Sequence, residues 1–134
     1  MTYAFDTNTM IDLLNDSEKT TSRKNDALAA ETRFIIPPVV DYEIRRGFKY
    51  KPYPKKEKAY YFFTQHFGVG EMINNMWVRS AIIYAQLRKK GLTVGDADIF
   101  IAAFSIMNGY TLVTSNKKHF QNIEEIKFED WSTE

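Results

Sequence analysis

Cysteine is absent from this sequence of 134 residues. Its absence excludes disulfides, thiolate nucleophiles, zinc–thiolate sites and iron–sulfur clusters, and it removes any link to an oxidising compartment. A catalytic or metal site in this protein must therefore be built from oxygen and nitrogen ligands.

Long hydrophobic runs are also missing. Residues 1–6 contain no basic stretch followed by an apolar run, and the longest nearly apolar run, Ile99–Met107, is too short to cross a bilayer. We therefore expect a cytoplasmic protein without a membrane segment. Hydrophobic residues make up 44% of the chain, which is enough for the core of one domain over residues 1–134.

The chain carries little net charge, +1, but its charges are unevenly distributed. Between Arg45 and Lys58, seven basic residues accompany a single acid, Glu57, so this stretch carries +6 and the remainder about −5. A molecule polarised in this way can bind a polyanion on one side and a metal ion on another.

Short apolar runs that alternate with helical patterns predict the fold class. The runs expected to be buried strands are residues 3–5, 34–36 and 111–113. Helical spacing is found at residues 8–14, 21–31, 39–46, 55–67, 75–90 and 96–107. Gly47 is expected to end the third helix, with residues 48–54 as a loop. This order predicts an α/β three-layer sandwich, with a central, mostly parallel sheet flanked by helices.

Acidic side chains follow or begin several of these elements. Asp6 lies just past the first strand, where open α/β sheets place their ligand crevice. Glu43 lies on the helix after the second strand, and Asp96 and Asp98 begin the helix before the third strand. Each also has an ordinary interpretation, as a helix cap or a solvated helix residue. Polar residues after the third strand, beginning at Thr114, would reach the same edge, and this convergence favours a site.

Carboxylates brought together in this way need a counter-charge. Two carboxylates about 4 Å apart repel each other by about 4 kcal/mol at an effective dielectric constant of about 20, so the cluster requires protons or a cation. Mg²⁺ and Mn²⁺ prefer oxygen ligands, and Mg²⁺ usually takes only one or two carboxylates. We expect Asp6 and Asp98 to bind the ion directly and Glu43 to hold or deprotonate a water.

Four motifs along the chain resemble, in order and spacing, those of VapC-type toxins of the PIN-domain ribonuclease family. They are Asp6-Thr7-Asn8 and residues 43–47 (EIRRG), 98–103 (DIFIAA) and 112–120 (LVTSNKKHF). Any one of them is weak evidence, because a tripeptide such as Asp-Thr-Asn is common. Four in register, from Met1 to about Trp131, make a strong resemblance.

The resemblance implies a PIN-like fold and a cytoplasmic endoribonuclease toxin that uses Mg²⁺ or Mn²⁺ to hydrolyse phosphodiester bonds in RNA, commonly tRNA. It also implies inhibition by a VapB-type antitoxin and, usually, a homodimer. By position, the residues similar to the three core acids are Asp6, Glu43 and Asp98. Asn8 and Thr114 are similar to residues that orient these acids and the water, and Asp96 is a possible additional metal ligand.

The last motif departs from the family pattern. Many relatives carry a fourth acid there, whereas this chain has Asn116 and His119. Asn116 can still bind a metal, or one of its waters, through its carbonyl, but a two-metal mechanism loses support. His119 is either a general acid or phosphate contact, or a partly exposed residue that packs beside Phe120.

RNA would be bound by the basic stretch. The predicted phosphate contacts are Arg45, Arg46, Lys49, Lys51 and Lys55. Tyr50 and Tyr53 lie between them and offer stacking surfaces for a single-stranded loop. The alternative is an ordinary solvated loop and helix face.

Two other functions are compatible with the sequence. A phosphohydrolase of the haloacid-dehalogenase type is suggested by residues 6–9 and 95–98, although Asn8 stands where that class has a second acid. A PIN-like RNA-binding module that has lost catalysis would explain the departure at His119.

Overall fold

A four-stranded parallel sheet forms the centre of the computed structural model, which describes residues 1–133; Glu134, the last residue of the predicted domain, lies outside them. The strands are β1 (Thr2–Phe5), β2 (Arg33–Ile35), β3 (Thr111–Val113) and β4 (Phe128–Glu129). Their order is β2-β1-β3-β4, and every neighbouring pair is parallel. The predicted α/β class with a parallel sheet is confirmed.

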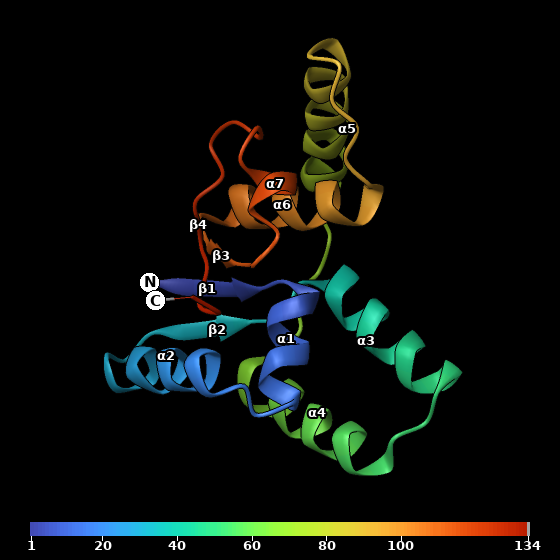
Figure 1. The fold of residues 1–134 in the computed structure, drawn as a ribbon. Coiled ribbons are helices and arrows are strands. Elements are labelled where there is room, and N and C mark those ends of the chain that lie inside the picture. Colours follow the sequence, from blue (N-terminus) through green and yellow to red (C-terminus); the bar gives the residue numbers. More distant parts are fainter. Residues whose placement is uncertain (134) are drawn as a thin grey trace.

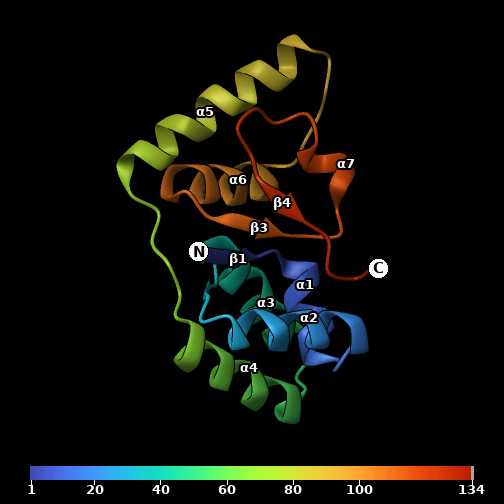
Figure 2. The same cartoon turned by 90° about the vertical axis from the view of Figure 1, so that its left-hand side faces the viewer.

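Helices cover both faces of this sheet. They are α1 (Thr7–Leu14), α2 (Glu18–Ala29), α3 (Pro38–Tyr50), α4 (Pro54–Phe67), α5 (Asn74–Lys89), α6 (Asp96–Asn108) and the short α7 (Lys117–Phe120). In Figures 1 and 2, α5, α6 and α7 lie above the strands and α2 and α4 below them, while α3 packs against both α1 and α6. The three-layer arrangement therefore has its strands buried on both faces, as their apolar sequences require.

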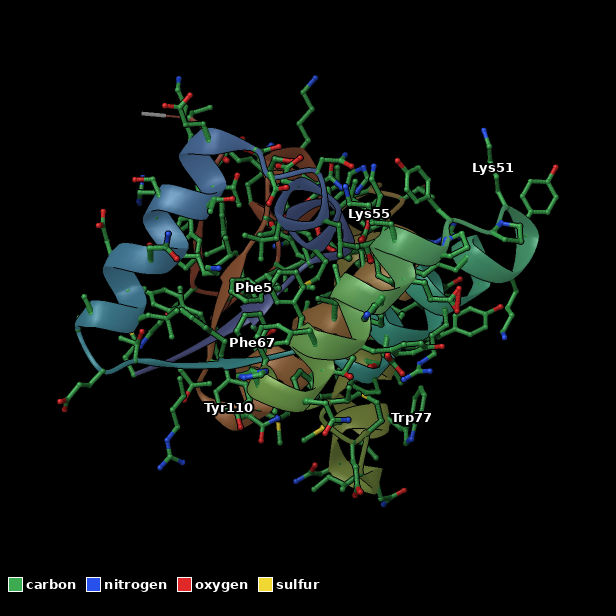
Figure 3. The ribbon with its side chains drawn as sticks, turned by 90° about the horizontal axis from the view of Figure 1, so that it is seen from below. Phe5, Lys51, Lys55, Phe67, Trp77 and Tyr110 are labelled. Carbon is green, nitrogen blue, oxygen red and sulfur yellow. The ribbon has the colours of Figure 1, made fainter. Side chains whose placement is uncertain are left out.

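Aromatic rings fill the space beneath β1. Phe5, completely buried, lies 5.1 Å from the ring of Phe34 and 5.6 Å from those of Phe67 and Trp131, centroid to centroid. Figure 3 shows Phe5 and Phe67 close together in the interior. Tilted and edge-on ring pairs of this kind add to the stability gained from burying the rings. They fix β1, and the residue that follows it, against β2 and α4.

Helix α3 is longer than predicted. Gly47 was expected to end it, but the helix continues through Gly47 to Tyr50. The added turn brings Phe48 to 6.3 Å from the ring of Tyr60 in α4, centroid to centroid. This tertiary contact favours helix beyond the glycine, whose cost within a helix is only about 1 kcal/mol. Residues 48–50 are therefore helix and not loop.

Two short elements were not predicted from the sequence. Helix α7 follows β3 directly, and β4 pairs with β3 through Leu112 and Phe128, and through Val113 and Glu129. A two-residue strand has no hydrophobic periodicity of its own, so only its pairing with β3 defines it. Within residues 1–133, no helix is both long and apolar enough to cross a membrane.

Candidate active site

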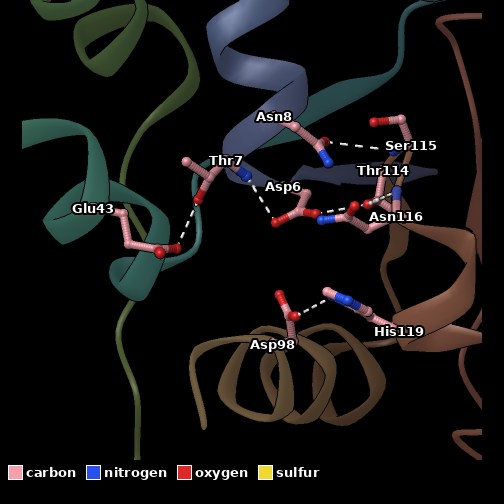
Figure 4. Close-up of polar contacts among 9 residues, drawn as sticks. All are labelled: Asp6, Thr7, Asn8, Glu43, Asp98, Thr114, Ser115, Asn116 and His119. Atoms are coloured by element: carbon pink, nitrogen blue, oxygen red, sulfur yellow. Dashed lines mark hydrogen bonds and ion pairs between the residues drawn. The ribbon is translucent and has the colours of Figure 1, made fainter. Parts of the chain in front are cut away.

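The carboxyl edge of the sheet places Asp6 beside Thr114. Phe5 of β1 and Val113 of β3 are partners in the parallel register, so the next residue of each strand lies at the same edge. The backbone N–H of Asp6 donates to the carbonyl of Val113 at 2.9 Å and continues the ladder by one residue. The predicted position of Asp6, just past a central strand, is the one observed (Figure 4).

Both carboxylate oxygens of Asp6 accept hydrogen bonds. Oδ1 accepts from the backbone N–H of Thr7 at 2.8 Å, which caps helix α1, and Oδ2 accepts from Oγ1 of Thr114 at 2.6 Å. Asp6 is only 2% exposed and Thr114 is completely buried. The capping role that the sequence allowed for Asp6 and its place in an acidic site therefore coexist.

Glu43 reaches the same region from α3. Its Oε1 accepts from the hydroxyl of Thr7 at 2.8 Å, and its Oε2 lies 3.4 Å from Nη2 of Arg46. Thr7 thus contacts two of the three predicted acids, one through its backbone and one through its side chain. The sequence analysis did not assign Thr7 a role, although its place between Asp6 and Asn8 in the first motif was a usable signal.

Asp98 faces Asp6 from the first turn of α6, a different helix from the one that carries Glu43 (Figure 4). Its Oδ2 lies 2.6 Å from Nδ1 of His119, which reaches it from α7. His119 therefore contacts an acid of the site. The sequence analysis did not predict this contact.

Asp96 is on a different side of α6 from Asp98. Two residues along a helix correspond to a turn of about 200° around its axis. Asp96 is exposed and lines a surface hollow together with Trp77 and Tyr84 of α5. The structure therefore does not bring Asp96 to the other acids.

The two amides of the predicted site lie at its border. Oδ1 of Asn8 is 3.4 Å from the backbone N–H of Ser115 and so connects α1 to the loop after β3. The backbone N–H of Asn116 donates to Oγ1 of Thr114 at 3.0 Å, and Asn116 is exposed. Thr114 thus accepts from Asn116 while it donates to Asp6, which fixes the direction of its hydroxyl.

The acids influence one another electrostatically. Burial raises the pKa of Asp6 from 3.8 to about 6, and the charges of Asp98 and Glu43 add to the rise. The hydrogen bonds from Thr114 and Thr7 act in the opposite direction. Negative charge is therefore concentrated at this edge, and a bound cation would relieve it.

The donor set suits a hard divalent cation, because Asp6, Glu43 and Asp98 offer only carboxylate oxygens. Within residues 1–133, no three Asp, Glu or His side chains lie close enough together to hold one ion in the arrangement observed. Mg²⁺ usually binds one or two carboxylates and retains several waters, so it does not require a third carboxylate ligand. Asp6 and Asp98, which face each other and interact electrostatically, are the residues that would hold such an ion.

The basic stretch lies along α3 and the beginning of α4. The predicted phosphate contacts within it are Arg45, Arg46, Lys49, Lys51 and Lys55. Arg46 is bound to Glu43, and Arg45 makes two hydrogen bonds of 2.9 Å from its Nε to Asp41. Lys51 directly follows the last residue of α3, while Lys55 lies in the first turn of α4 (Figure 3).

A parallel α/β sandwich with a buried aspartate after its central strand, and two further acids around it, defines the class of this protein. The family model described as PIN domain matches residues 3–126. The chain belongs to the PIN domain family.

Known proteins similar to this chain carry VapC names. Ribonuclease VapC1 of Methanocaldococcus jannaschii is 35% identical over 71 residues, which are 53% of this chain and 52% of that protein. The tRNA(fMet)-specific endonuclease VapC of Salmonella typhimurium is 37% identical over 54 residues, 40% of this chain and 41% of that protein. A crystal structure of DNA-bound VapBC from Salmonella typhimurium covers 98% of each chain with a TM-score of 0.87 and 26% identity. The resemblance to VapC-type PIN-domain proteins is confirmed, and the haloacid-dehalogenase alternative has no support from these similarities.

Proposed function

We propose that this chain is a divalent-cation-dependent endoribonuclease of the VapC type, which hydrolyses phosphodiester bonds in RNA. One observation carries the proposal: Asp6, Glu43 and Asp98 come from three elements to one sheet edge, where their charges interact. An acidic cluster of this kind suits Mg²⁺, or Mn²⁺, and phosphodiester chemistry. The name of the relative from Methanocaldococcus jannaschii supports the ribonuclease assignment.

Each acid has a different role in this proposal. Asp6 and Asp98 would hold the cation, and Glu43 would orient the attacking water and accept its proton. A bound divalent cation supplies positive charge against the scissile phosphate and the charge that develops during attack. Thr7 keeps Glu43 in place, and Thr114 does the same for Asp6. In-line attack by water leaves a 5′-phosphate and a 3′-hydroxyl.

Cleavage should depend on Asp98 and not on Asp96. Both are in the first turn of α6, so Asp98→Asn and Asp96→Asn remove the same charge from the same helix end. We expect Asp98→Asn to abolish new RNA 5′ ends and growth arrest in expressing cells, while Asp96→Asn cleaves like the unmodified chain. Purified protein should leave 5′-phosphate ends. Cyclic 2′,3′-phosphate ends would contradict the mechanism, and RNA binding without cleavage would favour the non-catalytic module.

We also propose that the basic residues of α3 and α4 bind the RNA backbone. Each lysine contact to a phosphate releases counterions, so it contributes to the salt dependence of binding. Changing Lys49, Lys51 and Lys55 to Glu should weaken RNA binding and flatten the plot of log affinity against log salt concentration. The matched control changes three lysines outside this face, Lys89, Lys90 and Lys127. An unchanged slope in the first variant would exclude this face as the binding surface.

The proposed partner is a VapB-type antitoxin, with tRNA as the substrate and a homodimer as the assembly. The similar Salmonella typhimurium structure is described as VapBC, and a relative from the same organism is named for tRNA(fMet). A cytoplasmic location follows from such a substrate. Co-expression of the cognate VapB-type protein should suppress the growth arrest, and that protein should co-purify with this chain. If growth arrest persists and the two proteins do not co-purify, the antitoxin is removed from the proposal.

A further inference from the structure

Exposed tyrosines on α3 and α4 are paired with basic side chains. The guanidinium of Arg46 lies over the ring of Tyr42, 5.2 Å from its centroid, and that of Arg45 lies 5.5 Å from the centroid of Tyr61. Tyr42 is 60% exposed and Tyr61 is 42% exposed. Single exposed aromatic residues are normal on protein surfaces. Here two exposed rings on adjacent helices are each held against a guanidinium group by a cation–π contact.

Tyr42 is directly connected to the acidic site. It precedes Glu43 in α3, and Arg46 bonds to Oε2 of Glu43 while its guanidinium covers the Tyr42 ring. Glu43 is in turn hydrogen-bonded to Thr7, next to Asp6. A group stacked on Tyr42 would therefore be linked through Arg46 to Glu43, the residue proposed to orient the attacking water.

A shallow hollow with a volume of about 500 Å³ lies along this face of α3. Its lining residues are Pro38, Asp41, Tyr42, Arg45, Arg46 and Lys49. The volume is within the range of pockets that accept small ligands. Three of the lining residues are cationic, which suits the phosphates on either side of a nucleobase.

Asp41 is the one acid that lines the hollow, and its carboxylate is already engaged. It accepts two hydrogen bonds of 2.9 Å from Nε of Arg45 and one of 2.6 Å from the hydroxyl of Tyr60. These bonds hold Arg45 by its Nε, so the terminal nitrogens of its guanidinium are available to an anion. Asp41 thus orients Arg45 and offers little repulsion to a phosphate.

Resting on the proposed ribonuclease activity, we propose that Tyr42 and Arg46 form a stacking subsite for an unpaired nucleobase next to the scissile phosphate. Arg45 and Lys49 contact the neighbouring phosphates. A base can stack on a side chain only when it leaves the RNA double helix, so the substrate class is RNA with unpaired nucleotides. This assignment differs from the sequence expectation, which placed stacking at Tyr50 and Tyr53.

Binding measured without cleavage tests the subsite. The chain carrying Asp98→Asn is titrated with a single-stranded RNA oligonucleotide of mixed sequence, and with the same strand annealed to its complement. We expect Tyr42→Ala to weaken single-stranded binding by about 5- to 150-fold, as the loss of one stacked base does, and to leave duplex binding unchanged. Tyr42→Phe should bind like the parent, because a phenyl ring stacks without the hydroxyl.

Tyr84 provides a matched control, because it is 45% exposed on α5 and has the guanidinium of Arg88 5.1 Å from its ring centroid. Tyr84→Ala should leave RNA binding unchanged. Tyr42→Leu keeps more of the apolar side chain than Tyr42→Ala but has no aromatic face, so it replaces Tyr42→Ala if that variant fails to fold. It should show the same selective loss.

The outcomes separate this inference from the proposed function. If the unmodified chain cuts RNA and Asp98→Asn does not, the activity stands whatever Tyr42 does. Unchanged single-stranded affinity in Tyr42→Ala, or an equal loss for single strand and duplex, would then overturn the stacking subsite alone. In the cleaving protein, Tyr42→Ala should raise KM much more than it lowers kcat, whereas a purely structural defect would change both.

Discussion

Removing the charge of Asp6 should stabilise the protein in the absence of a cation. Burial and the neighbouring acids raise the pKa of Asp6 from 3.8 to about 6. Each unit of difference corresponds to about 1.36 kcal/mol, so keeping Asp6 ionised in the folded protein costs about 3 kcal/mol. The side chain is 2% exposed, so solvent screens little of this cost. Asp6→Asn removes it.

The amide cannot reproduce both hydrogen bonds of the carboxylate. Oδ1 and Oδ2 accept from Thr7 and Thr114, whereas asparagine has one acceptor oxygen, so about 1 kcal/mol is lost. The net expectation is that Asp6→Asn raises the free energy of unfolding by about 1–2 kcal/mol at about pH 7.5.

The sign of the pH dependence follows from the direction of the shift. Because the folded pKa is raised, folded protein binds more protons than unfolded protein between pH 3.8 and about 6. The contribution of Asp6 to stability is therefore fully present below 3.8 and is lost as the pH rises through about 6. At about pH 4 the cost of ionisation is almost gone while the lost hydrogen bond remains, so Asp6→Asn should there be less stable than the unmodified chain, by up to about 1 kcal/mol.

Urea unfolding in EDTA, followed by the fluorescence of the buried Trp131, measures this difference. Asp96→Asn, a change at an exposed site, should stay within about 0.5 kcal/mol of the unmodified chain. Mg²⁺ should then make the unmodified chain more stable than Asp6→Asn, because only the unmodified chain retains the full site, and a ligand at 100 times its Kd stabilises the protein that binds it by about 2.7 kcal/mol. An Asp6→Asn variant that is less stable than the unmodified chain in EDTA at about pH 7.5, or a difference that does not change with pH, would refute the reasoning.

Further predictions concern a positioning contact and a packing contact. Thr7→Val removes the hydroxyl that donates to Glu43 at 2.8 Å, so kcat should fall about tenfold or more, while Thr7→Ser should retain activity; equal rates for both variants would contradict the role. Gly70→Ala would place a Cβ 2.3 Å from Cζ of Phe104, so we expect a loss of about 1–3 kcal/mol in urea unfolding. Gly47→Ala, with nothing within 4 Å, should instead stabilise helix α3 by about 0.5–1 kcal/mol.

Much of the site was predictable because parallel strands obey a simple rule. Asp6 and Thr114 each follow a buried strand, and parallel neighbours in register bring such residues to the same edge. The residue types then indicate oxygen-ligand chemistry without any structure. The roles of these residues in catalysis stay predictions, which the variants above test.

Other features could not be read from local patterns. Gly47 is a common helix terminator, yet Phe48 packs against Tyr60, twelve residues further along the chain, and the helix continues. His119 contacts Asp98 only because α7 follows the third strand back toward α6. These contacts depend on residues far apart in sequence, which periodicity and capping rules do not connect.

The fold class, the PIN-type motifs and the acids that could form a site were readable from the sequence, because the succession of elements along the chain and the chemistry of each residue are local properties. That Asp98 faces Asp6 while Asp96 faces α5 depends on the folded structure, since the elements packed around a helix determine which of its faces points into the site. The folded structure also decided that Thr7 supports Glu43 and that Arg46 links Glu43 to Tyr42. Oxygen and nitrogen atoms from distant segments pair only after the core has fixed the distances between them.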